Sequence, residues 1–314
     1  MSQPPAPMQL FVPGEPSDPP AGLSYPEALT RPGQSPAQPV FGLLLAFSAF
    51  ALITPLFAQL ILRVGHLFRG GEWADYLEAA NSYLVVEGPV SGLLALALLT
   101  PICMLLVRYV NGIRPRWLFS VQPGPRWRYL LMCLVVAVVI LNAVLWVGYA
   151  VKGVPEFHGG DAGWLVYLVA LSITSPLQAV AEEVFFRGYL LHGIGTAVGH
   201  GAWGTWAGVV GSAAVFAMLH GTQNPALFAH RLSFGLIMGA LVVVTGGLEA
   251  GIAAHVVNNL GAYAYALFTS SIAELKSTTA ITWTDAAFDI AGFAIFAVVA
   301  WWLGRRLQVA VTTP

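Results

Sequence analysis

Long apolar segments follow one another along the chain from Val40 almost to its C-terminal end. They cover residues 40–62, 88–110, 129–151, 164–190, 203–220, 226–245, 248–268 and 286–304. Most of them reach the ~20 residues with which an α-helix crosses the hydrocarbon core of a bilayer. We therefore predict an all-α fold: a polytopic transmembrane helix bundle of about eight helices over residues 40–310, with seven or nine helices as alternatives.

The composition excludes two other classes of protein. Only 14 Lys/Arg and 15 Asp/Glu occur among the 314 residues, which is 9% of the chain, whereas an ordinary soluble domain carries about 25% charged residues. The mean hydropathy of +0.72 agrees with a membrane protein. The net charge of -1 and the lack of a basic run also argue against a nucleic-acid partner, because such proteins gather cations against phosphate.

Residues 1–39 differ in composition from the rest of the chain. They hold 11 of the 21 prolines and no apolar run. Such a segment buries too little surface to offset the entropy lost on ordering. The sequence therefore predicts a disordered, Pro-rich N-terminal tail.

Arginines gather in the connection between the second and third predicted helices. Arg114, Arg116, Arg126 and Arg128 lie in this connection, and Arg108 directly precedes it. The positive-inside rule makes such a connection cytoplasmic. With eight crossings both termini are then cytoplasmic, and we expect an integral, multi-pass protein of the plasma (inner) membrane.

Two adjacent glutamates interrupt the fourth apolar segment. A carboxylate within a membrane span is costly, so Glu182 and Glu183 are functional candidates. Arg187 lies four residues after Glu183 on the same helical face, which suits an ion pair. Adjacent helix positions point about 100° apart, so this pairing leaves Glu182 free to face a polar cavity. The alternative is a purely structural network of all three side chains.

Two histidines and an amide lie in later apolar segments. His220 ends the fifth segment, while His255 and Asn259 lie four residues apart in the seventh and therefore share a helical face. If a turn around His200 joins the fourth and fifth helices, Glu182 and His220 lie at nearly the same depth, because they are 18 and 20 residues from it. A lone membrane histidine is usually an interhelical hydrogen bonder, but this combination points to a shared site.

Three short motifs carry these residues in order along the chain. They are Glu-Glu-Val-Phe-Phe-Arg (182–187), Phe-Ala-Met-Leu-His (216–220) and His-Val-Val-Asn-Asn (255–259). Together they resemble the motifs Glu-Glu-x-x-x-Arg, Phe-x-x-x-His and His-x-x-x-Asn of the CAAX prenyl protease type II family of intramembrane endopeptidases, also called the CPBP or Abi family. The resemblance covers about residues 164–268 and implies hydrolysis of a peptide bond in a membrane-associated peptide or protein.

The resemblance also implies roles for individual residues. Glu182 matches the catalytic glutamate that activates a water molecule for attack on a peptide carbonyl. Glu183 and Arg187 match the partners that complete the first motif, and Phe216 opens the second motif. We expect these three residues to support the site.

The second and third motifs imply further catalytic residues and a metal. His220 matches the histidine of the second motif, while His255 and Asn259 match residues proposed to bind metal or to form an oxyanion hole. Imidazoles and a carboxylate are common zinc ligands, so Glu182, His220 and His255 are the candidate ligands of a divalent metal, zinc in the first place. An amide is a poor zinc ligand, and we expect Asn259 to stabilise the oxyanion.

Two other functions fit a membrane scaffold of this kind. One is a non-catalytic membrane immunity or binding protein, and the other is a small proton-coupled transporter that uses Glu182, His220 and His255 as a relay. The complete set of motifs favours the peptidase, and the sequence lacks the paired half-helices or internal repeat of a transporter. The expected partners are a membrane-associated peptide or protein substrate and membrane lipid, with no nucleic acid. His230 and Arg231 are expected at an interface, or else at the mouth of the cavity.

Overall fold

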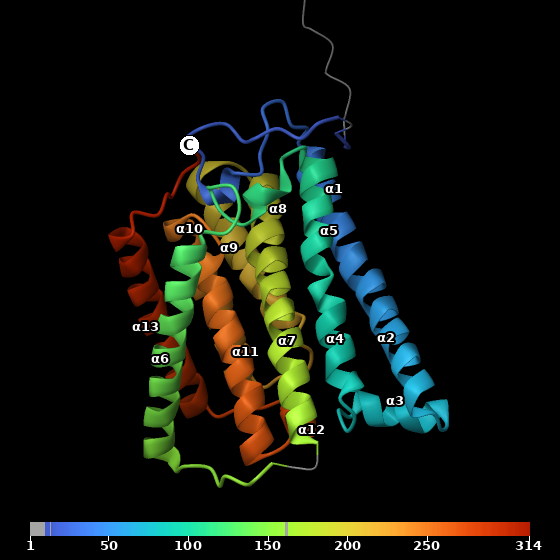
Figure 1. Cartoon of the computed structure of the whole chain (residues 1–314). Helices are drawn as coiled ribbons and strands as arrows, with labels where there is room; N and C mark the ends of the chain where they lie inside the picture. Colours follow the sequence, from blue (N-terminus) through green and yellow to red (C-terminus); the bar gives the residue numbers. More distant parts are fainter. Residues whose placement is uncertain (1–9, 13, 161–162) are drawn as a thin grey trace, which may run out of the picture.

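The computed structural model describes residues 10–12, 14–160 and 163–314, and over these residues the fold is helical (Figure 1). The described residues form no β-strand, only isolated bridges. The long helices lie side by side, and the short helix α3 lies across the end of α2. The α-helices are α1 (Ala37–Ser48), α2 (Thr54–Arg69), α3 (Trp73–Asn81), α4 (Glu87–Ala97), α5 (Leu99–Leu106), α6 (Trp127–Lys152), α7 (Trp164–Glu182), α8 (Leu191–Val198), α9 (Gly201–Met218), α10 (Pro225–Thr245), α11 (Glu249–Thr269), α12 (Ile272–Ser277) and α13 (Trp283–Arg306). The 3-10 turns are η1 (Tyr25–Glu27) and η4 (Pro115–Leu118), and the π-helical segments are η2 (Ala49–Ile53), η3 (Val107–Asn111) and η5 (Glu183–Leu190).

The predicted apolar segments all lie in helices, which confirms the all-α fold class. Within the described residues, six helical stretches are long and apolar enough to cross a membrane: 37–69, 87–111, 127–152, 164–198, 225–245 and 283–306. The remaining two predicted spans correspond to α9 and α11. Many apolar positions of α9 are the small residues glycine and alanine, and α11 carries polar residues that include His255 and Asn259. The protein is therefore an integral membrane protein.

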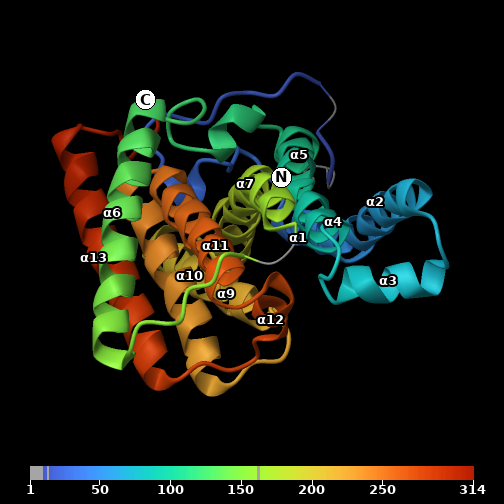
Figure 2. The ribbon, with the colours of Figure 1, turned by 60° about the horizontal axis from the view of Figure 1, so that its bottom comes forward.

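The bundle has two distinct edges around a central helix. Figure 2 shows α2 and α3 at one edge, α6 and α13 at the opposite edge, and α7 between them. Neighbouring pairs include α4 with α7, α7 with α11, α6 with α11, and α8 with α9. Helix α7 therefore packs against α11, which carries the third motif.

Both described terminal regions lie at the end of the bundle that holds the arginine-rich connection (Figure 1). Isolated bridges join Ser17 to Ile113 and Ser24 to Thr312. This is the same-side arrangement expected for an even number of crossings. The assignment of this end to the cytoplasm stays a prediction from the positive-inside rule.

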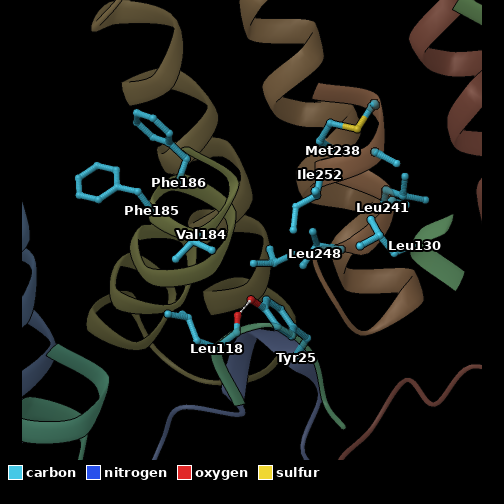
Figure 3. Packing of buried hydrophobic residues seen from close by; sticks show 14 of the residues in the cluster. Tyr25, Leu118, Leu130, Val184, Phe185, Phe186, Met238, Leu241, Leu248 and Ile252 are labelled. Carbon is cyan, nitrogen blue, oxygen red and sulfur yellow. Dashed lines mark hydrogen bonds between the residues drawn. The ribbon is translucent and has the colours of Figure 1, made fainter. Parts of the chain in front are cut away.

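The N-terminal segment corrects one expectation. The sequence predicts a disordered tail over residues 1–39, but residues 10–36, apart from residue 13, pack on this end of the bundle. Tyr25 is buried and donates its hydroxyl to the carbonyl of Leu118 at 2.6 Å (Figure 3), and His192 Nδ1 donates to the carbonyl of Pro26 at 2.9 Å. A few buried anchors thus compensate for a proline-rich composition. Residues 1–9 and 13 lie outside the described part.

Charged groups fix the same segment to the arginine-rich connection. The indole of Trp117 donates to Asp18 at 2.7 Å, and Arg114 and Arg116 approach the same carboxylate at 2.5 and 3.0 Å. The indole hydrogen bond, aided by the guanidinium groups, lowers the pKa of Asp18 from its ordinary value, although its partial burial opposes this. The segment is therefore held by apolar anchors on one side and by ion pairs on the other.

Glycines allow α8 and α9 to pack closely. A Cβ at Gly195 would lie 2.8 Å from the carbonyl oxygen of Gly204, and a Cβ at Gly208 would overlap the carbonyl oxygen of Leu191. Both obstacles are backbone atoms of a neighbouring helix, which cannot turn aside as a side chain can. Small residues at such crossings are a general feature of membrane helix packing.

We predict that Gly208→Ala destabilises the protein by about 1–3 kcal/mol or more, because the added methyl group must push α8 away from α9. Gly261→Ala is the matched control, since nothing lies within 4 Å of a Cβ at that helical position. Thermal unfolding in detergent measures both variants. Equal melting temperatures for the two variants would contradict this account of the helix crossing.

Candidate active site

The first motif lies where α7 passes into a π-helical segment. Glu182 is the last residue of α7, and every residue of η5 (Glu183–Leu190) is buried. Segments of this kind are rare and often mark functional sites, because they change the direction of side chains within a helix. Glu182 is 7% exposed, whereas Glu183 and Arg187 are fully buried.

Glu183 and Arg187 form the predicted ion pair. Arg187 Nη1 lies 3.0 Å from Glu183 Oε1, and both side chains are 0% exposed. The guanidinium carbon lies 4.2 Å from the centre of the Phe216 ring and 5.1 Å from that of Phe234, so the cation faces aromatic rings as well as the carboxylate. A Cβ at Gly251 would lie 2.7 Å from Glu183 Oε2. The absence of a side chain at Gly251 therefore lets α11 approach the pair.

His255 connects the two glutamates. Its Nδ1 donates to Glu183 Oε1 at 2.8 Å, and its Nε2 lies 3.5 Å from Glu182 Oε2. The ring is 4% exposed. Because the Nδ1–H group donates to Glu183, Nε2 directs its lone pair toward Glu182 when the ring is neutral.

Acidic groups outnumber permanent cations around His255. Glu182 and Glu183 lie near one guanidinium, that of Arg187, and Glu183 is the carboxylate that pairs with it. Buried charges are costly unless they are paired. The basic neighbour of Glu182 is therefore the imidazole of His255.

His220 lies at the edge of the cluster. It follows the end of α9, is exposed, and donates Nδ1 to the carbonyl of Phe216 at 2.6 Å. The Phe216 ring lies 4.6 Å from the His220 ring and 6.1 Å from the His255 ring, measured between centroids. Phe216 therefore contacts both histidines, and His220 keeps Nε2 available on the open side.

Asn259 approaches α7 through a residue that the sequence interpretation missed. Asn259 Nδ2 donates to Gln178 Oε1 at 3.1 Å. Asn258 Nδ2 in turn donates to Asn259 Oδ1 at 3.2 Å. Gln178 is buried and lies four residues before Glu182, on the same face of α7. That spacing is the sequence signal that identifies it. The two bonded amides of Gln178 and Asn259 therefore lie on the face of α7 that carries Glu182.

The donor types fit a zinc site, but the described residues do not assemble a complete one. Glu182 and His255 direct an oxygen and a nitrogen at each other, and both histidines hold Nδ1 against an acceptor, as metal-bound histidines usually do. In residues 10–12, 14–160 and 163–314, however, no three His, Cys, Asp or Glu side chains are grouped closely enough to hold a metal ion. The divalent metal at Glu182, His220 and His255 stays a prediction.

The fold and the candidate site define a polytopic membrane protein in which Glu182, Glu183, Arg187 and His255 are buried between helices. Residues 162–261 match the family model of the type II CAAX prenyl endopeptidase Rce1-like proteins, which confirms the family resemblance over this part of the chain. At the level of the family, this match supports a CAAX-type intramembrane protease. The uncharacterised protein YyaK of Bacillus subtilis (strain 168) is 27% identical over 218 residues, covering 64% of this chain and 71% of YyaK. No solved structure matches the chain.

We predict that Arg187→Ala lowers the free energy of unfolding by about 3–5 kcal/mol, because it leaves Glu183 buried without its counter-ion. Thermal unfolding in detergent measures the loss. The control is Arg69→Ala, which breaks an ion pair with Glu87 whose arginine side chain is 45% exposed. Pairs of this exposed kind contribute about 0–1 kcal/mol.

Wild-type stability in Arg187→Ala would rule out the ion pair as a structural element. A loss no larger than that of Arg69→Ala would have the same meaning.

Proposed function

We propose that the protein is an intramembrane endopeptidase that hydrolyses a peptide bond of a membrane-associated peptide or protein. The observation that carries this proposal is the chain Glu182–His255–Glu183, in which a carboxylate faces an imidazole whose other nitrogen is held by a second carboxylate. A base whose partner is oriented by a third group is the general pattern of hydrolytic sites. The Rce1-like match of residues 162–261 supports the same conclusion.

The first chemical step uses Glu182 as the general base. It takes a proton from a water molecule while the water oxygen forms a bond to the scissile carbonyl carbon. His255 stabilises the change in charge on Glu182. Glu183 holds the His255 ring in the orientation and tautomer that this requires. Burial excludes bulk water and strengthens each of these interactions.

The carbonyl oxygen becomes an oxyanion in this step. We assign its stabilisation to the side-chain amides of Asn259 and Gln178, each of which has two N–H groups. One N–H of Asn259 is already used to bind Gln178, and this contact fixes the position of both amides. In the second step the C–N bond breaks and the leaving nitrogen receives the proton from Glu182.

His220 gives the proposed site its third nitrogen donor. With Nδ1 bound to the carbonyl of Phe216, its Nε2 is directed elsewhere. We propose that Glu182, His220 and His255 hold a divalent metal, zinc in the first place, which would supply Lewis-acid polarisation of the carbonyl when bound. We further propose a plasma-membrane location with both termini in the cytoplasm, in contact with lipid and without a nucleic-acid partner.

We expect Glu182→Gln to abolish cleavage of a reporter peptide, with a loss of about 10²–10⁴-fold or more, because an amide cannot accept the proton of water. The purified variant and wild type are compared in the same detergent, and equal melting temperatures exclude misfolding. The control is Glu274→Gln, which neutralises an exposed glutamate of α12. A Glu182→Gln variant that cleaves at the wild-type rate would contradict the role of Glu182 as the base, whereas a wild type that cleaves no peptide would favour a non-catalytic binding protein.

Metal analysis of the purified protein tests the proposed zinc site. We expect about one equivalent of zinc in the wild type, and a loss of both the metal and peptide cleavage in His220→Ala. Chelator treatment should have the same effect, reversed by added zinc. Full activity of a metal-free protein would contradict the proposed zinc site. It would not contradict the role of Glu182 as the base.

A further inference from the structure

A polar cavity lies beside the proposed active site, between α6, α11 and α13. Its volume is about 320 Å³. Its walls are formed largely by aliphatic side chains and glycines of the three helices. The polar side chains that line it are Asn142, Tyr149, Asn258, Tyr265, Thr269, Ser270 and Asp289. So many polar groups within a membrane bundle indicate a binding site rather than a packing defect.

One carboxylate in this region lacks a full counter-charge. Lys152 forms an ion pair with Asp285, one turn before Asp289 on α13. Among the described residues, the basic side chain that contacts Asp289 is His230, whose Nε2 lies 3.5 Å from its Oδ2. An ordinary imidazole is mostly neutral at pH 7. The four groups therefore carry one net negative charge, and Asp289, whose side chain is 44% exposed, presents it toward the cavity.

Aromatic rings in the wall favour the same kind of ligand. The rings of Tyr149 and Tyr265 lie 6.2 Å apart at an interplanar angle of 78°. The faces of such rings attract cations, most strongly where water is excluded. The apolar wall also suits the methylene stem of a long basic side chain.

Two sets of side-chain contacts place the cavity next to the proposed active site. Asn258 lines the cavity and donates to Asn259, the proposed oxyanion residue. Phe293 also lines it and packs on Phe234 with ring centroids 4.9 Å apart, and Phe234 packs on His255 at 5.1 Å. The cavity and the proposed active site are therefore neighbours within the bundle.

We propose that this cavity binds the basic side chain, lysine or arginine, of the peptide substrate, with Asp289 as its counter-ion. That the bound peptide is a substrate rests on the proposed function. The proximity of the cavity to Asn259 and His255 favours a peptide over a lipid headgroup, because a peptide substrate is long enough to contact both sites. From Asn259 to Tyr265 helix α11 rises about 9 Å, which an extended peptide spans with about three residues. The basic residue should therefore lie about three residues from the cleaved bond.

The test compares two peptides that differ only in this residue, lysine in one and uncharged norleucine in the other. We expect the wild type to prefer the lysine peptide by about tenfold in kcat/KM, and Asp289→Asn to lose this preference. The ratio of the two peptides cancels any general loss of folded enzyme. Glu156→Gln is the matched control, since it removes an exposed carboxylate in the loop after α6 that does not line the cavity, and should keep the tenfold ratio.

A binding measurement separates this inference from the proposed function. The Glu182→Gln protein should bind the fluorescent lysine peptide about tenfold more tightly than the norleucine peptide, and the Glu182→Gln/Asp289→Asn protein should not. If neither peptide is cleaved by the wild type but this difference in binding holds, the endopeptidase proposal fails and the cavity assignment stands.

Two outcomes overturn the inference. One is equal binding and equal cleavage of the two peptides by the wild type, and the other is a preference for the lysine peptide that survives Asp289→Asn. Loss of a co-purified amine-headgroup lipid in Asp289→Asn, without any peptide preference, would likewise overturn it and assign the cavity to lipid.

Discussion

The fully buried ion pair between Glu183 and Arg187 is the interaction on which the rest of the site depends. Arg187 is held by the rings of Phe216 and Phe234, and Glu183 in turn holds His255. Without the guanidinium, Glu183 would be an unpaired charge among apolar helices. The pair thus sets the position and tautomer of the imidazole that faces Glu182, and the reactive geometry follows from a structural contact.

Close helix packing and the moderate hydropathy of α11 make this arrangement possible. Gly251 admits Glu183 against α11, and Gly208 lets α9 lie close to α8. The polar residues of α11 keep that helix outside the set of strongly apolar spans. The helix that carries His255 and Asn259 therefore packs against more apolar helices, such as α6.

Sequence periodicity predicted the helices, the Glu183–Arg187 pair and the shared face of His255 and Asn259, because each depends on local spacing. It did not predict contacts that require the tertiary fold. Gln178 shares a face with Glu182, but its contact with Asn259 depends on how α7 meets α11. The packing of residues 10–36 depends on a few buried residues such as Tyr25. The average composition of the segment does not reveal such single residues. Asp289 lies near a span end, and the role proposed for it depends on the cavity that the tertiary fold forms around it.

The central claim is that Glu182 activates the water that cleaves the peptide bond. Cleavage of a reporter peptide in ¹⁸O-labelled water tests it most directly, with mass spectrometry of the new carboxyl group. We expect one labelled oxygen in the product of the wild type and no product with Glu182→Gln. Labelled product formed by Glu182→Gln at the wild-type rate would show that another group activates the water, and would contradict the account.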